Sequence, residues 1–205
     1  MLEPPPVQGG GKSVVTGPGT GPKECEERAL LNQIAAGDQR AMNRFYALYQ
    51  KRVFAFVLNR LKDSNEAQEV VNDVMWEVWK SAGSFEGRSR ISTWVFGIAY
   101  FKAVDRLRKR KTVETIELVP DSLQDDGPDA VSAVFSEEVS QAVAKAMGDL
   151  SPEQRALVHL AFFEDLSYGE IAEIVACPVG TVKSRMSRVR SILSGALATL
   201  RETNP

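Results

Sequence analysis

Hydrophobic residues recur at spacings of three and four along almost the whole chain, and no alternating run is long enough to predict a strand. This period predicts an all-α fold. A first helix is expected over 26–36, and a second should start after Asp38, whose side chain can cap it, and end near Leu61. Asp63 and Glu66 have the spacing of a capping box at the start of a third helix.

The third predicted helix separates valines from acids when its residues are placed about 100° apart. One side carries Ala67, Val70, Val71, Val74 and Val78, and the opposite side carries Glu66, Glu69, Asp73 and Glu77. Trp76 falls beside the acids. A solvated acidic face with a partly covered tryptophan would explain this pattern. A protein-docking surface would explain it equally, because tryptophan flanked by charge is a common interface anchor.

The segment 84–111, SFEGRSRISTWVFGIAYFKAVDRLRKRK, combines aromatic rings with positive charge. Eight bases face two acids there, and its predicted helix carries apolar residues on two sides, only one of which is needed for a core. A fully buried helix would also have two apolar sides, but Lys102, Arg106 and the basic run 108–111 argue against full burial. Because rings stack on unpaired bases and cations hold phosphates, the pattern favours binding of single-stranded nucleic acid.

Two short helices that begin at capping boxes are predicted in the C-terminal third. Ser151 pairs with Gln154 in the first box, and Ser167 pairs with Glu170 in the second. Pro178 cannot continue the second helix, so a further helix should begin after it, near residue 179 or 180. The two later helices are therefore separated by a tight turn.

The helix after this turn is amphipathic in an unusual way. Its narrow apolar stripe consists of Val182, Met186, Val189 and Leu193. The opposite face combines small hydroxyls with arginines: Thr181, Ser184, Arg185, Arg188 and Ser191. Small side chains permit close approach to DNA, and arginine can pair with guanine or phosphate. The pattern predicts a helix-turn-helix whose last helix enters the major groove; an ordinary hairpin with a solvated cationic face is the alternative.

The uneven charge of the chain, which has a formal net charge of −2, divides it into segments. Residues 1–25 are rich in proline and glycine, which predicts a disordered tail. Residues 112–136 contain six acids and no base, which predicts an acidic linker. Two helical domains are therefore expected, at 26–111 and 137–205.

Several function classes lose support from the composition. Two cysteines and one histidine form neither a zinc motif nor a disulfide framework, and no phosphate-cradling loop or nucleophile–base pair is evident. We therefore expect no metal, no cofactor and no catalytic residues, with His159 structural. No apolar run reaches the ~20 residues of a membrane span, and the N-terminus does not have the pattern of a secretory signal, so a cytoplasmic protein is expected.

The order of four segments resembles the extracytoplasmic-function (ECF) sigma factors of bacteria. These segments are AAGDQRAMNRFYALY, EAQEVVNDVMWEVWK, SRISTWVFGIAYFKAVDRLRKR and, after the acidic linker, LSPEQRALVHLAFFEDLSYGEIAEIVACPVGTVKSRMSRVR. The resemblance covers about residues 26–200. It implies a promoter-specificity subunit, with sigma region two at 26–111 and sigma region four at 137–205.

The resemblance also implies three sets of contact residues. The helix at 66–80 would dock on the clamp helices of the RNA polymerase beta-prime subunit through Glu69, Asn72, Asp73, Trp76 and Trp79. The minus-ten element, as a single strand, would meet Phe85, Arg88, Ser89, Trp94, Phe96, Lys102 and Arg106. The minus-thirty-five element, as a duplex, would meet Thr181, Lys183, Ser184, Arg185, Arg188 and Ser191.

Further partners follow from the same resemblance. Region four would also contact the flap of the polymerase beta subunit, the acidic linker could mimic RNA in the polymerase cleft, and an anti-sigma factor could hold the chain at the inner membrane face. One departure concerns Ala176, at a turn position where the family often has glycine. No small-molecule substrate is implied. The alternative from another class is a helix-turn-helix regulator that acts without polymerase.

Overall fold

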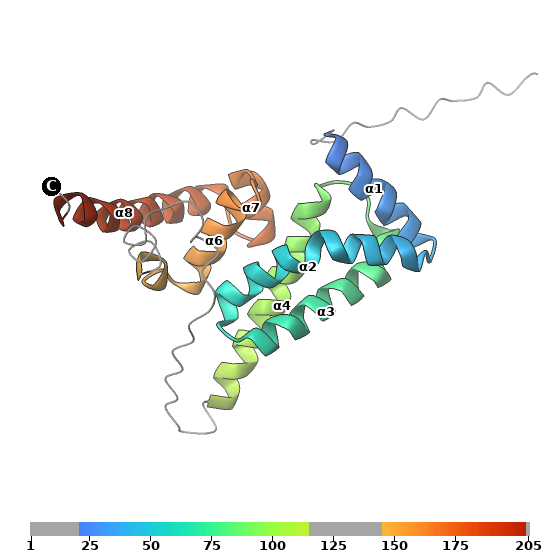
Figure 1. Cartoon of the computed structure of the whole chain (residues 1–205), viewed down its shortest axis with the longest axis horizontal. Coiled ribbons are helices and arrows are strands. Elements are labelled where there is room, and N and C mark those ends of the chain that lie inside the picture. The colour runs from blue at the N-terminus through green and yellow to red at the C-terminus, as the bar shows by residue number, and fades with distance from the viewer. Residues whose placement is uncertain (1–20, 115–144, 204–205) are drawn as a thin grey trace, which may run out of the picture.

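The computed structural model describes residues 21–114 and 145–203, apart from the side chains of 111–114 and 196–203. Every regular element in these ranges is helical, which confirms the all-α prediction; 145–148 form a short helical turn. The predicted tail and almost all of the acidic linker lie outside the described residues. The elements (Figure 1) are α1 (Pro22–Ala35), α2 (Gln39–Leu61), α3 (Ser64–Ser81), the 3-10 turn η1 (Ala82–Ser84), α4 (Ile91–Glu114), α6 (Pro152–Phe162), α7 (Tyr168–Ile174) and α8 (Val179–Thr203).

The helix boundaries differ from the predicted ones at two places. Helix α1 begins at Pro22, four residues earlier than expected, because proline is favoured in the first turn of a helix. Residues 22–25 therefore belong to a helix and not to the predicted tail. Helix α4 runs to Glu114, three residues into the predicted linker. Asp38 caps α2 as predicted, accepting hydrogen bonds from the backbone N–H groups of Arg40 (2.7 Å) and Ala41 (3.2 Å).

The capping boxes at Ser151 and Ser167 are confirmed, with both of their reciprocal hydrogen bonds present. The predicted box at the start of α3 is only half formed. Asp63 accepts from the Glu66 backbone N–H at 2.9 Å, but the Glu66 carboxylate lies 2.9 Å from the guanidinium of Arg110 on α4. An ion pair with a neighbouring helix has replaced the second bond of the box.

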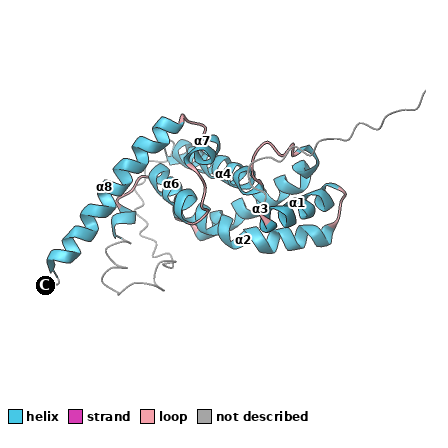
Figure 2. Ribbon diagram, turned by 90° about the horizontal axis from the view of Figure 1, so that it is seen from above, coloured by secondary structure: helices cyan, strands magenta, loops and turns pink. Residues whose placement is uncertain are grey.

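One hydrophobic core joins the N-terminal group of helices (α1–α4) to the C-terminal group (α6–α8). The valine side of α3 is buried as predicted, and side chains of α2 and α4 continue the same core into α6 and α7. Both views place α6 and α7 between α8 and the N-terminal group (Figures 1 and 2). A smaller cluster formed by Leu150, Val158 and Val189 fixes α8 to α6.

Arginines bridge the two groups along α2. The Arg155 Nε donates to the Asn59 carbonyl at 3.0 Å, and the Arg60 Nη1 donates to the Pro152 carbonyl at 3.2 Å. Burial, with the nearby charge of Arg60, lowers the pKa of Arg155. Arg60 is buried and lies over the Tyr100 ring, 4.6 Å from its centre. Because both backbone carbonyls are hydrogen-bonded and Arg60 is buried, this is a specific contact between the groups.

Candidate nucleic-acid interface

Helices α7 and α8 form the predicted helix-turn-helix. The chain turns at Ala176, which adopts φ +50°, and α8 begins at Val179 directly after Pro178. Alanine in this left-handed conformation carries a modest strain that glycine would avoid. The apolar stripe of α8 packs inward as predicted, with Val182, Met186 and Val189 fully buried. The helix is thereby held in one rotational setting.

The opposite face of α8 is open to solvent. Lys183, Ser184, Arg185, Arg188 and Ser191 are exposed, and Thr181 is half-buried at the start of the helix. Within the part of the chain that the structure describes, the three cations of this face form no ion pair. A cationic face that no carboxylate neutralises is suited to duplex DNA, because its full charge is available to phosphates and base edges.

A polar loop at 85–90 connects η1 to α4. The Phe85 ring packs on the Trp94 ring with their centres 5.1 Å apart, and both side chains are half-buried. Arg88 is exposed and pairs with Glu86 at 2.9 Å, while Ser89 is half-buried. The loop and the start of α4 thus carry two packed aromatic rings and a solvent-exposed cation, side-chain types that stack on bases and hold phosphates of an unpaired strand.

Phe96 does not belong to this surface, which corrects its sequence-based assignment. Its ring is fully buried and meets the Phe56 ring edge-on, with centres 5.4 Å apart. The core takes the side of α4 that carries Phe96, because α2 and α6 pack there. Phe101, on the other side of α4, is 54 % exposed instead.

A shallow groove of about 470 Å³ lies between α4 and α7. From α4 it is lined by Trp94, Ile98, Phe101 and Lys102, and from α7 by Glu173 and Ile174. Next to it, the Thr93 hydroxyl donates to the Glu170 carboxylate at 3.2 Å. Burial would raise the pKa of Glu170, but hydrogen bonds from Ser167 and the charge of Arg90 lower it. Part of the α4 surface is therefore covered by the helix-turn-helix.

Comparison with known proteins agrees with this arrangement. Residues 45–113 match the family described as Sigma-70 region 2, and residues 140–193 match the one described as Sigma-70, region 4. SigK, an ECF RNA polymerase sigma factor of a Mycobacterium species, is 31% identical over 160 residues, which cover 77% of this chain and 83% of that protein. The chain belongs to the ECF sigma factors. As such it is the subunit that binds RNA polymerase and directs promoter-specific initiation.

Two further proteins resemble this sigma factor over most of their length. The RNA polymerase sigma-H factor of Pseudomonas aeruginosa is 29% identical over 184 residues, which cover 85% of this chain and 95% of that one. Among solved structures, the sigma factor RpoE of Bartonella quintana, in complex with the anti-sigma factor NepR, superimposes with a TM-score of 0.61. It is 26% identical, and the match covers 76% of this chain and 96% of that chain.

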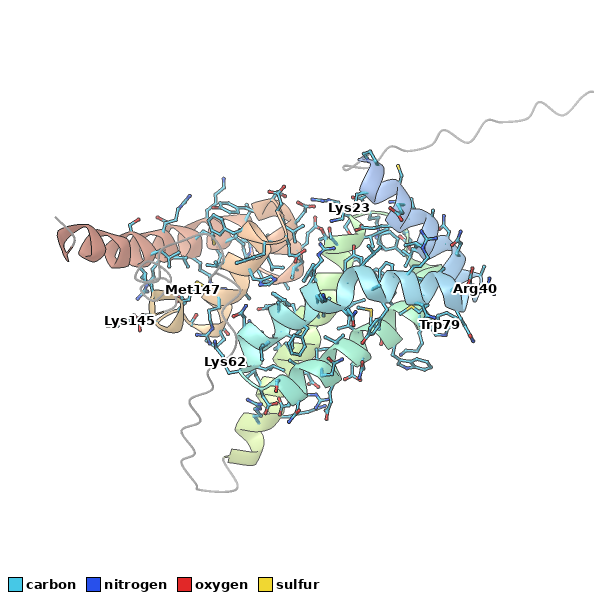
Figure 3. The ribbon with its side chains drawn as sticks, viewed as in Figure 1. Lys23, Arg40, Lys62, Trp79, Lys145 and Met147 are labelled. Carbon is cyan, nitrogen blue, oxygen red and sulfur yellow. The ribbon has the colours of Figure 1, made fainter. Side chains whose placement is uncertain are left out.

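The α3 surface of the sigma factor exposes four of the five residues assigned to polymerase docking: Glu69, Asn72, Asp73 and Trp76. Trp76 is 61 % exposed, so a tryptophan covered by a neighbour is not what the structure shows. Asn72 is exposed beside it and accepts from the Gln68 amide at 3.4 Å. Trp79, labelled in Figure 3, is half-buried against the core near the end of α3. Trp79 therefore supports the α3 surface from below and exposes little of its own ring to a partner.

Cations of α4 pair with the acids of α3 in a ladder across the two helices. Arg106 lies 2.7 Å from the Glu69 carboxylate and 3.5 Å from that of Asp73, and Lys102 lies 3.8 Å from that of Glu77. The hydrogen bond to Glu69, with the charges of both acids, raises the pKa of Arg106. Residues that the sequence assigned to two partners, polymerase and DNA, thus contact each other in the free sigma factor.

Sequence reasoning missed the contact between Arg28 of α1 and Gly87 of the loop. Gly87 adopts φ +72°, and a Cβ atom on it would lie 2.6 Å from the Arg28 Nη1. Glycine in a short polar loop was the only local signal.

None of the described helices is both long and apolar enough to cross a membrane, and the described residues contain no group of three or more potential metal ligands.

Proposed function

We propose that the sigma factor reads its promoter in two places, with region two at 26–111 and region four at 137–205. Region four reads the minus-thirty-five element as a duplex, and region two holds the minus-ten element as a single strand. Bond formation is left to the polymerase, as in a specificity subunit. Transcription places the protein in the cytoplasm.

The exposed cationic face of α8 is the observation that carries this proposal. Its arginines lie on a helix that buried Val182 and Met186 hold in place, and the hydroxyls around them leave room for DNA. A recognition helix in the major groove needs one buried face that fixes its orientation and an opposite face of small and cationic side chains that can approach the bases. Arg185 and Arg188 are the proposed base- or phosphate-contacting residues, with Thr181, Lys183, Ser184 and Ser191 around them.

The minus-ten strand is proposed to bind at the 85–90 loop and the exposed side of α4. Phe85 and Trp94 offer rings for stacking, and Arg88 and Ser89 offer polar contacts next to them. Each stacked base would contribute on the order of 1–3 kcal/mol. Lys102 and Arg106 are nearby cations, although both are paired with α3 acids in the free protein.

RNA polymerase core is proposed to dock on α3, through Trp76 with Glu69, Asn72 and Asp73. A large exposed ring among charged side chains is typical of an interface anchor. The clamp helices of the beta-prime subunit would take this surface, and the flap of the beta subunit would take region four. With few phosphate contacts of its own, the isolated sigma factor should bind DNA weakly and with strong salt dependence.

An anti-sigma factor is proposed as a further protein partner. The sigma factor RpoE of Bartonella quintana was solved with such a partner, NepR. In this chain, Phe162 and Phe163 at the end of α6 are 64 % and 55 % exposed, so apolar surface is available beyond the α3 site. Adjacent exposed phenylalanines are unusual on a protein that acts alone.

Reconstituted transcription tests the proposed function. Purified sigma factor and bacterial core polymerase are mixed with a genomic fragment library, and transcript starts are sequenced with and without the sigma factor. Defined starts that share two upstream elements at a fixed separation, and depend on the added protein, are expected. Sequence-specific duplex binding without core binding or new starts would instead identify a polymerase-independent regulator.

A further inference from the structure

Helix α1 lies outside the residues matched to region 2, which begin at residue 45, yet it reaches the loop proposed to capture the strand. Two of its side chains, Glu24 and Arg28, contact the loop at different points. Neither residue belongs to any surface assigned above. Their contacts decide how firmly the loop is held against the rest of the protein.

Arg28 contacts the first half of the loop in two ways. Its guanidinium carbon lies 5.8 Å from the centre of the Phe85 ring, within the range of a cation–π contact. The same guanidinium approaches Gly87 so closely that a Cβ atom there would lie 2.6 Å from Nη1 and 3.1 Å from Nη2. Gly87 therefore serves both the left-handed backbone, with φ +72°, and the space that Arg28 occupies.

Phe85 transmits this contact to α4. Its ring also packs on Trp94, with centres 5.1 Å apart, so Arg28, Phe85 and Trp94 form a continuous row of contacts from α1 to α4. Both rings of the proposed stacking site lie in this row. Because the cation–π contact already restricts the Phe85 side chain, less conformational entropy is lost when a base stacks on its ring.

Glu24 holds the end of the loop. The Arg90 Nε lies 3.3 Å from the Glu24 carboxylate, and the Arg90 Nη1 lies 3.5 Å from the Glu170 carboxylate of α7. Arg90 is the last residue before α4, so α1 fixes the loop both at Phe85 and where the helix begins. The loop is bound at both ends by one helix.

We propose that Arg28 is a positioning residue for capture of the minus-ten strand: it acts on the strand through Phe85 and makes no contact with DNA itself. This rests on the proposed function, in which Phe85 stacks on an unpaired base. The proposal predicts that Arg28 and Phe85 depend on each other, and that loss of Arg28 leaves the number of phosphate contacts unchanged.

The test uses the full sigma factor assembled with core polymerase. The probe is a promoter from the start-mapping experiment with its minus-ten region already unpaired, so that binding reports strand capture and not melting. Affinity is measured at several salt concentrations for the parent, Arg28→Ala, Phe85→Ala and their double variant, and also for Gly87→Ala and Trp94→Ala. Arg44→Ala is the matched control, because Arg44 is also exposed, pairs with Glu26 of α1 at 3.3 Å and, among the described residues, forms no ion pair or ring contact with the loop.

Arg28→Ala is expected to weaken capture by about two- to fivefold, as loss of one exposed cation–π contact would. The slope of log affinity against log salt should stay that of the parent, whereas loss of a phosphate contact to the single strand would reduce it by about 0.7. In the Phe85→Ala background, Arg28→Ala should have no further effect. Gly87→Ala should reproduce the loss, since it disturbs the same contact from the loop side.

Each other result overturns a defined part of this account. If Phe85→Ala weakens capture but Arg28→Ala does not, or if the two effects add, Arg28 has no positioning role and the stacking site stands. A reduced salt slope would make Arg28 a phosphate contact instead. If neither Phe85→Ala nor Trp94→Ala weakens capture, the proposed strand site is wrong and the role of Arg28 falls with it.

Discussion

Arg52 of α2 and Glu164, just after α6, form a buried ion pair that joins the two groups of helices. The Arg52 Nε donates to Glu164 at 3.0 Å, its Nη2 donates to the same oxygen, and the Glu164 side chain is 2 % exposed. Arg52 also lies over the Tyr49 ring. Burial lowers the pKa of Arg52, but the hydrogen bond from Arg52 to Glu164 and the charge of Glu164 have the larger effect, so the pKa is raised. Arg52 is therefore held in its charged form.

Replacing Glu164 with glutamine should destabilise the protein by about 3 kcal/mol, because a partly buried guanidinium would lose its carboxylate. Urea unfolding of parent and variant measures the change, with an unchanged slope showing that the folded state has kept its compactness. The exposed pair Arg44–Glu26 provides the control, and Glu26→Gln should cost less than about 1 kcal/mol. Equal effects of the two variants would contradict a special role for the buried pair.

Arg185→Ala and Arg188→Ala should each weaken initiation from a promoter with an intact minus-thirty-five element, by roughly 1–3 kcal/mol where the contact to a base is bidentate. The measurement is run-off transcription on promoters with and without that element. Arg190→Ala is the matched control, since Arg190 is exposed on the same helix but lies on a side turned away from Arg185 and Arg188. Unchanged promoter selectivity in the first two variants would remove both arginines from that face.

Trp76→Ala combined with Asp73→Ala should weaken binding of core polymerase, by about 2 kcal/mol or more if Trp76 is the anchor of the interface. Competition for core against a labelled sigma factor measures the loss, and circular dichroism should show unchanged helicity because both side chains are exposed. Leu48→Ala with Glu26→Ala removes an exposed apolar and an acidic side chain elsewhere and should bind core normally. Normal core affinity of the α3 variant would locate the docking surface on another element.

Glu27→Gln should stabilise the protein at neutral pH. Burial raises the pKa of Glu27 above its usual value of 4.5, more than the side chain of Tyr49 and the charges of Arg52 and Lys23 lower it. Between 4.5 and the raised value, the folded state binds more protons than the unfolded state, so the parent loses stability as the pH rises through that window. The glutamine variant cannot ionise at this position and should therefore keep the stability that the parent loses.

Thermal unfolding of both proteins from pH 4.5 to 8 tests this. The difference in midpoint should be small at pH 4.5, grow as the pH rises and then remain constant. Exposed Glu26, changed to glutamine, should show no such growth. A Glu27→Gln variant less stable than the parent at pH 7 would mean that ionised Glu27 is needed by its neighbours.

Much of this architecture was predictable because the signals are local. Helical periodicity identified the buried valines of α3 and the apolar stripe of α8, and serine capping boxes located the starts of α6 and α7. Pro178 marked the turn. Each of these signals lies within about a dozen consecutive residues, so no knowledge of tertiary contacts is needed.

The errors concern contacts between distant segments. The sequence shows two apolar sides on α4 but not which one the C-terminal helices cover, so Phe96 was assigned to the surface although it is buried. Arg52 and Glu164 are 112 positions apart, and no local pattern connects them. Lys102, Arg106 and Arg110 recur every four residues and so indicate one charged side of α4, but the resemblance assigns Glu69 and Asp73, the partners of Arg106, to polymerase docking.

Helix α7 occupies a place on α4, at Thr93 and along the groove beside Trp94, that nothing else can occupy at the same time. A ligand that settles there must displace the first helix of the DNA-reading motif, and a motif that stays there keeps the ligand out. The two groups of helices therefore do not act independently of each other. Both groups of helices use the same part of α4, so a change in the position of either group changes the space that is open to the other.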